Sequence, residues 1–142
     1  MMFYTGISRN SSSIASSTIN QIFEHEDKYH ALYQMVERGQ NILLGDNNID
    51  DFGYLLNEAW EIKRKLSSLI SSNYIDDIYK RAINAGALGG KVLGSGGGGF
   101  MIFFSADGKQ EQIKQSLKNL LYVPFEFEQS GSQIVYDSKE FH

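Results

Sequence analysis

The sequence has no cysteine and a single proline, Pro124, among its 142 residues. Without cysteine the chain can form no disulfide, bind no metal through a thiolate and use no thiol as a nucleophile. No apolar run approaches the roughly 20 residues that span a bilayer. The apolar start, residues 1–4, is too short for a signal peptide and has no basic residues before it. These absences predict a soluble cytoplasmic protein with no membrane contact.

Basic residues are also scarce, with 13 lysines and arginines against 17 aspartates and glutamates, which gives a net charge of −4. A protein that binds DNA or RNA usually carries a basic patch that neutralises phosphates, so we expect no nucleic-acid partner. The hydrophobic share of 42% and charged share of 21% are typical of a soluble globular domain. The length suits one domain with its own core, and we expect a single domain over residues 1–142.

Apolar residues recur at helical spacing in four segments of the first 85 residues. The third segment is the clearest, since Phe52, Leu55, Leu56, Ala59 and Ile62 form the stripe of a core-facing helix. We expect helices from about Asn10, over Asp27–Leu44, from near Asp50, and over about Tyr74–Ala85. Hydroxyls of residues 11–13 would cap the first helix, and Asn73 with Asp76 resembles a cap for the fourth. A fifth helix, carrying Ile113, Leu117, Leu120 and Leu121, should follow the Asp107-Gly108 turn.

Strand patterns occur at both ends of the chain. Residues 3–4 suit a short strand, and the continuous apolar run Phe100–Phe104 is typical of a strand covered on both faces. Phenylalanine and glutamate alternate over residues 125–128, and residues 134–136 form a last apolar run, so we expect a strand in each. This order predicts an α+β domain: a ferredoxin-like antiparallel sheet with several helices packed on one face.

The segment from Gly86 to Phe100 is unusually rich in glycine, which costs conformational entropy on folding. Two physical reasons can justify that cost. Glycine adopts positive φ, which lets successive N–H groups form an anion-binding concavity, and it lets a ligand or a second backbone approach closely. The residues alone leave both a ligand-binding loop and a tight structural turn open.

Two known phosphate loops can be tested against this segment. Gly94, Gly96 and Gly99 match G-x-G-x-x-G, but a dinucleotide fingerprint follows a strand and opens a helix. Here we expect the segment to follow a helix and open a strand, which excludes that fingerprint. Lys91 is followed by valine, and Ala85 stands five residues before Gly90, so a Walker loop is excluded as well.

The segments Gly86-Ala-Leu-Gly-Gly-Lys91 and Gly94-Ser-Gly-Gly-Gly-Gly99-Phe resemble the third conserved motif of the GHMP kinases, a family named after galactokinase, homoserine, mevalonate and phosphomevalonate kinases. The helices that carry Leu55-Leu-Asn-Glu-Ala-Trp60 and Ile75-Asp-Asp-Ile78, and the start Tyr4-Thr-Gly-Ile-Ser-Arg9, are similar to family elements. The subgroup resembled most is the D-glycero-D-manno-heptose 7-phosphate kinases. Ser95 departs from the alanine that is common there.

The resemblance implies that this chain is the C-terminal domain of an ATP- and Mg²⁺-dependent sugar kinase. The family's ATP loop, Pro-x-x-x-Gly-Leu-x-Ser-Ser, is absent, so the N-terminal domain is expected to be missing, and with it the catalytic acid and the Mg²⁺ ligand. No catalytic residue is therefore expected here, and this fragment alone should be inactive. The residues expected beside the ATP phosphates are Lys91, Gly94, Ser95, Gly96, Gly97, Gly98 and Gly99.

Three residues are candidates for binding a sugar phosphate. Arg9 could bind the phosphate through two hydrogen bonds, or could equally be solvated or ion-paired. Trp60 could stack on a sugar face with Lys63 nearby, although a half-buried tryptophan is the more common finding. His25 and His30 are spaced poorly for two ligands on one helical face, and no carboxylate pattern completes a metal site, so we expect none.

The competing hypothesis is a free-standing ferredoxin-like module that binds a small anion or regulates another chain. Such a module should fold stably alone, whereas a kinase half should leave an apolar face uncovered. If the chain is a kinase half, that uncovered face, near Trp60 and the glycines, should favour homo-oligomers.

Overall fold

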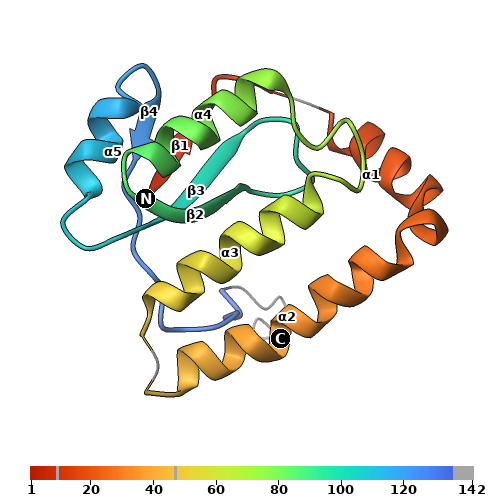
Figure 1. Cartoon of the computed structure of the whole chain (residues 1–142), viewed down its shortest axis with the longest axis horizontal. Coiled ribbons are helices and arrows are strands. Elements are labelled where there is room, and N and C mark those ends of the chain that lie inside the picture. Colours follow the sequence, from red (N-terminus) through yellow and green to blue (C-terminus); the bar gives the residue numbers. More distant parts are fainter. Residues whose placement is uncertain (9, 47, 136–142) are drawn as a thin grey trace, which may run out of the picture.

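The computed structural model describes residues 1–8, 10–46 and 48–135 (Figure 1). Within these ranges the chain forms four strands, five α-helices and a short 3₁₀-helix. In chain order they are β1 (Met2–Tyr4), α1 (Ser11–Asn20), the 3₁₀-helix (Ile22–His25), α2 (Glu26–Leu44), α3 (Asp50–Lys63), α4 (Asn73–Asn84), β2 (Ala87–Val92), β3 (Phe100–Ser105), α5 (Gln110–Ser116) and β4 (Leu121–Val123).

The strands form one antiparallel sheet in the order β2-β3-β1-β4. The first strand of the chain is therefore central: Phe3 lies opposite Met101 on β3 and opposite Tyr122 on β4. This is the strand order of a ferredoxin-like sheet, and the expected fold class is confirmed.

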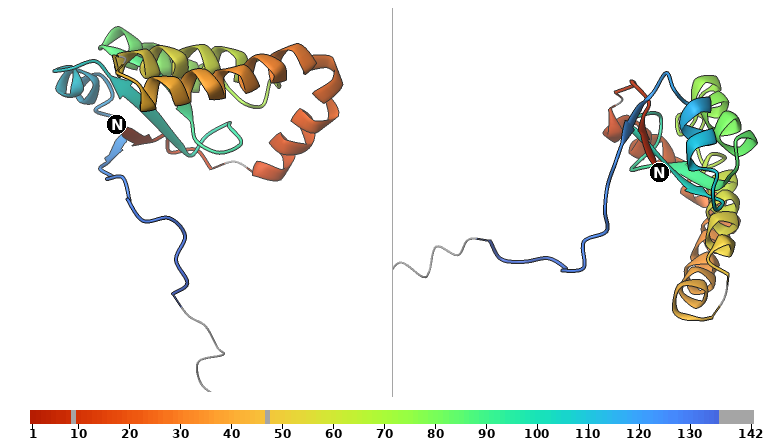
Figure 2. Two further views of the ribbon diagram at one scale, coloured as in Figure 1. Left: turned by 90° about the horizontal axis from the view of Figure 1, so that it is seen from below. Right: turned by 90° about the vertical axis from the view of Figure 1, so that its left-hand side faces the viewer.

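The helices cover one face of the sheet (Figure 2). Helix α4 contributes Ile75, Ile78 and Ala82, which are fully buried, to a core that includes Met101 and Phe103 of β3. Its apolar residues recur every three or four positions, so a single face of the helix meets the sheet. The sequence predicted the five α-helices because this periodicity is local and needs no knowledge of the sheet.

Helix α3 lies unusually close to β2. A Cβ on Gly89 would come within 2.0 Å of the backbone oxygen of Gly53, and a Cβ on Gly53 would come within 2.7 Å of Leu88 Cβ. Because both positions are glycine, the backbone of α3 packs directly against the backbone of β2. This contact positions α3 over β2 and over the loop that follows β2. One glycine of the rich segment, Gly89, therefore serves packing.

Four details of the predicted elements were wrong. The fifth helix was expected to include Leu120 and Leu121, but α5 ends at Ser116 and Leu121 begins strand β4. Residues 87–92 form strand β2, although their glycines gave no strand signal. The strand expected over residues 125–128 does not form, because β4 ends at Val123 and Phe127 is 89% exposed with no neighbouring strand. The caps also differ from those expected. The side chain of Asn10 accepts a hydrogen bond from the Ser12 N–H at the start of α1, and the side chain of Ser72 accepts one from the Ile75 N–H at the start of α4.

The segment after β4 runs away from the body of the domain (Figure 2). Ile134 and Val135 are exposed and lie outside any strand; residue 136, the end of the expected last strand, lies outside the described residues. Among the helices that the structure describes, none has the length and apolarity needed to cross a membrane.

Candidate functional site

The glycine-rich loop is the turn of a β-hairpin, residues 93–99 between β2 and β3. It follows a strand, not a helix as expected, but it still opens a strand, so the dinucleotide fingerprint stays excluded. Gly94, Gly96, Gly97 and Gly99 all have φ between 74° and 119°, a range that L-residues with side chains rarely adopt. The backbone path of the turn therefore requires glycine.

Two neighbouring segments hold the loop in place. The Gly97 N–H donates to the carbonyl of Ile70, and the Gly99 N–H donates to the carbonyl of Ile7, each at 2.8 Å. The Gly99 carbonyl accepts from both the N–H and the hydroxyl of Thr5, at 2.8 and 2.9 Å. The loop is therefore anchored to the segment after β1 and to the segment between α3 and α4.

This anchoring leaves no room for side chains at two positions. A Cβ on Gly96 would lie 2.9 Å from the Cα and carbonyl oxygen of Ile70, and one on Gly98 would lie 2.8 Å from the carbonyl oxygen of Ile7. Both contacts are tighter than real Cβ atoms make, so the loop would have to shift. Tight packing thus accounts for part of the glycine content.

The loop also presents donors that the protein itself does not use. The N–H groups of Ser95, Gly96 and Gly98 have no hydrogen-bond partner within the described residues. All three residues line a cavity of about 300 Å³, together with Tyr4, Ile7, Ser8, Ser11, Leu93, Gly94 and Gly99. Unpaired backbone N–H groups around a concavity are a common way to bind an anion. Gly97, whose N–H is occupied, is not part of the lining.

A second cavity, of about 190 Å³, brings together three of the predicted site residues. Trp60, Lys63 and Lys91 line it with Leu32 and Ala59. The ammonium of Lys63 donates to the carbonyl of Gly94 at 2.7 Å, which connects α3 to the start of the glycine loop. Burial, and to a smaller extent the positive charge of Lys91, lowers the pKa of Lys63 below its usual range. Lys91 itself does not line the loop cavity.

Trp60 is a core residue with 1% of its surface exposed, and its ring packs 6.0 Å from that of Tyr79. A ring buried on this scale offers no face on which a sugar could stack, so the structure contradicts the stacking interpretation. Its Nε1–H is buried and has no acceptor within the described residues. A buried donor without an acceptor costs about 1–3 kcal/mol.

Sequence reasoning missed the residues that support the loop. Ile70 lies in the segment between α3 and α4, and Arg64 ties the two ends of that segment together through an ion pair with Asp76. Thr5 is buried and holds Gly99. The only signal for Thr5 was its place in the Tyr4–Arg9 stretch, from which we selected Arg9. Arg9 lies outside the described residues.

Metal-binding side chains do not cluster in the parts of the chain that the structure describes: no group of three or more histidine, aspartate or glutamate residues is placed to hold an ion. The backbone N–H donors of the loop suit an anion and not a cation.

Residues 30–123 match the family model described as "GHMP kinases C terminal". The chain is 30% identical over 123 residues to the D-glycero-alpha-D-manno-heptose 7-phosphate kinase of Campylobacter jejuni, covering 83% of this chain but 35% of that protein. It is 21% identical to the bifunctional fucokinase/GDP-fucose pyrophosphorylase of Arabidopsis thaliana, with 83% and 12% covered. The chain thus spans about a third or less of these relatives.

The fold has similar solved structures as well. L. major mevalonate kinase in complex with R-mevalonate superposes with a TM-score of 0.69 at 22% identity, covering 83% of this chain and 37% of that one. A protein from Listeria innocua superposes with a TM-score of 0.70 at 19% identity, covering 88% and 38%. Members of the matched family are kinases, and the matched residues include the whole glycine-rich hairpin. The chain belongs to the GHMP kinases and carries their C-terminal domain.

Proposed function

We propose that this chain is the C-terminal half of an ATP-dependent, cytoplasmic sugar kinase of the heptose 7-phosphate type. Its glycine loop would form the floor of the site where the phosphoryl group is transferred. The observation that carries this proposal is the set of unpaired N–H groups on Ser95, Gly96 and Gly98 around one cavity. The name of the Campylobacter relative supports the choice of acceptor.

The loop would act through position and charge alone. Phosphoryl transfer depends on holding the reactants in line and on neutralising the charge that spreads over the equatorial oxygens. Fixed N–H dipoles stabilise such charge without having to reorganise during the reaction. The hydrogen bonds from Gly97 and Gly99 to neighbouring segments keep the other three donors in place.

The remaining catalytic parts would come from an N-terminal half that this chain does not contain. The sequence has no ATP loop, and the described residues form no ligand set for Mg²⁺. A bound metal would neutralise phosphate charge, and its ligands would come from that half. Because positioning requires both halves, we expect no turnover from this chain alone.

Reconstitution tests this proposal. This chain would be co-expressed with the N-terminal half of the Campylobacter jejuni heptose kinase, and ATP-dependent phosphorylation of heptose 7-phosphate would be measured for the pair and for each half. We expect saturable turnover from the pair and none from either half. Turnover by this chain alone would contradict the division into halves. A stable complex without activity towards heptose 7-phosphate would contradict the acceptor, and no complex at all would favour the free-standing anion-binding module.

A further inference from the structure

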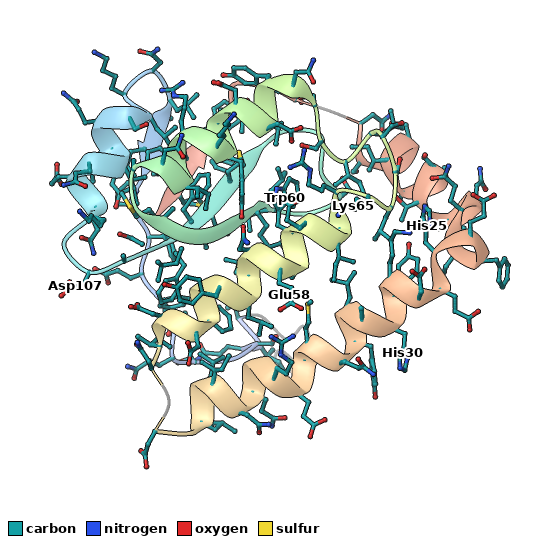
Figure 3. The ribbon with its side chains drawn as sticks, viewed as in Figure 1. His25, His30, Glu58, Trp60, Lys65 and Asp107 are labelled. Carbon is teal, nitrogen blue, oxygen red and sulfur yellow. The ribbon has the colours of Figure 1, made fainter. Side chains whose placement is uncertain are left out.

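The cavity lined by Leu32, Ala59, Trp60, Lys63 and Lys91 shares no lining residue with the glycine-loop cavity. A further cavity of about 370 Å³ adjoins both, since Leu32 and Lys63 of the one and Ser95 of the other line it. Its polar groups come from two elements. Trp60 and Lys63 lie on the last turn of α3, and Lys91 lies on β2 beneath that helix (Figure 3 labels Trp60). The rest of the lining is apolar and contains no acidic side chain.

The two lysines lack a counter-charge. Within the described residues neither forms an ion pair, and the only hydrogen bond of Lys63 goes to the carbonyl of Gly94. Arg64, the residue that follows α3 and is also partly buried, pairs with both Glu61 and Asp76. Partly burying two ammonium groups beside each other without an anion is unfavourable, because each loses hydration and repels the other.

The indole of Trp60 adds a donor that has no acceptor among the described residues. Its Nε1–H is buried and has no acceptor within the described part of the chain. Buried polar groups nearly always have a partner, so a buried indole N–H without an acceptor, on a residue that lines the same cavity as the two lysines, needs an explanation. An anion bound in this cavity would supply the absent negative charge to the two lysines.

We propose that this cavity binds a phosphate-type oxyanion, either free inorganic phosphate or the phosphate group of an ester. The volume of about 190 Å³ is several times the roughly 30 Å³ that one water molecule occupies in the liquid, so a tetrahedral oxyanion fits. Charge-assisted hydrogen bonds from lysine to phosphate oxygens would stabilise it. Because Lys63 also holds Gly94, occupancy of this cavity would stiffen the start of the glycine loop. The proposal does not depend on the kinase assignment.

Trp60 is the only tryptophan of the chain, so intrinsic fluorescence reports directly on this cavity. The pure chain would be titrated with inorganic phosphate at constant pH, with sodium chloride holding the ionic strength fixed. We expect a saturable fluorescence change and a rise in Tm, because a ligand that binds only the folded state stabilises it. A response no larger than that to chloride, with no rise in Tm, would overturn the proposal.

Substitutions locate the site. Lys91→Gln and Lys63→Gln should each weaken phosphate binding at least tenfold, while circular dichroism stays native. Lys65→Gln is the matched control, since Lys65 lies just beyond α3 (Figure 3), is exposed and lines neither cavity. This variant should bind phosphate as tightly as the parent does. Loss of binding in all three variants, or in none, would contradict the site. A parallel titration with a sugar phosphate identifies the source: tighter binding of the ester indicates a substrate phosphate, and equal or weaker binding indicates the free ion.

Discussion

Tyr79 joins α4 to α3, because its hydroxyl donates to the side-chain oxygen of Asn57 at 2.6 Å. Burial, followed by the negative charge of Glu61, raises the pKa of this hydroxyl to about 12. In the unfolded chain a tyrosine ionises near pH 10. The folded state therefore keeps its proton over a pH range in which the unfolded state has lost it.

This difference predicts a loss of stability at high pH. Between pH 10 and 12 the unfolded state binds fewer protons than the folded state, so the free energy of unfolding must fall as pH rises. A shift of two pKa units corresponds to at most about 2–3 kcal/mol. Denaturant unfolding of the parent and of Tyr79→Phe from pH 8 to 12 would measure it. The parent should be about 1 kcal/mol more stable at pH 8 and should lose that advantage by pH 12; a constant difference would contradict the pKa.

At the residue scale, the sequence pointed to individual positions but could not show their surroundings. Lys63, Lys91 and Trp60 were all selected, yet the cavity that they share depends on the crossing of α3 over β2. That crossing is set by Gly53 and Gly89, a backbone contact that no side-chain pattern reveals. Trp60 was misread for the same reason, since the burial of its ring depends on the closeness of this packing.

At the scale of elements, the segment between α3 and α4 links the helices to the glycine loop. Arg64 near the end of α3 pairs with Asp76 in the first turn of α4 at 2.5 Å, and Ser71 donates to the same carboxylate. Between them lies Ile70, whose carbonyl accepts the Gly97 N–H. The ion pair thus positions the segment that supports the loop.

Removing the Arg64–Asp76 ion pair should weaken the anchoring of the glycine loop, although neither residue belongs to the loop. Asp76→Ala removes a partly buried carboxylate and leaves Arg64 with Glu61 alone, so we expect the free energy of unfolding to fall by about 1–3 kcal/mol. Hydrogen exchange at the Gly97 amide should quicken as well. Asp77→Ala is the control, because Asp77 pairs with Arg81 at the exposed surface, where such pairs contribute about 0–1 kcal/mol. Equal effects of the two substitutions would contradict the linkage.

The elements that sequence predicted well are those whose signal is local. The periodicity of α2, α3 and α4 is complete within each helix, and their predicted bounds differ from the observed ones by at most three residues. Strands depend on their neighbours. Strand β2 forms despite two glycines in its middle because β3 and α3 lie against it. Residues 125–128 alternate as a strand does but have no partner strand among residues 1–8, 10–46 and 48–135.

At the scale of the whole molecule, apolar surface is exposed on α2 and its surroundings. We expected it near Trp60 and the glycine loop: Trp60 itself is buried, whereas Leu93 and Phe100 at the two ends of the loop are 38% and 40% exposed. Phe23, Tyr33 and Leu44 are largely exposed, and α2 and α3 enclose an apolar groove of about 560 Å³. Exposed apolar surface of this kind favours association, either with an N-terminal half or between copies. Self-association of the isolated chain stays a prediction.

The central claim is that the glycine loop lies beside the transferred phosphoryl group, and turnover by loop variants in the reconstituted enzyme tests it most directly. Gly98→Ala places a Cβ against the carbonyl of Ile7 and displaces an N–H donor, while Gly131→Ala adds a methyl group in open space. We expect Gly98→Ala to lower kcat at least tenfold, about 1.4 kcal/mol in the barrier, with native circular dichroism. Gly131→Ala should keep the parental kcat. A folded Gly98→Ala enzyme with unchanged kcat would show that the loop is only a structural turn.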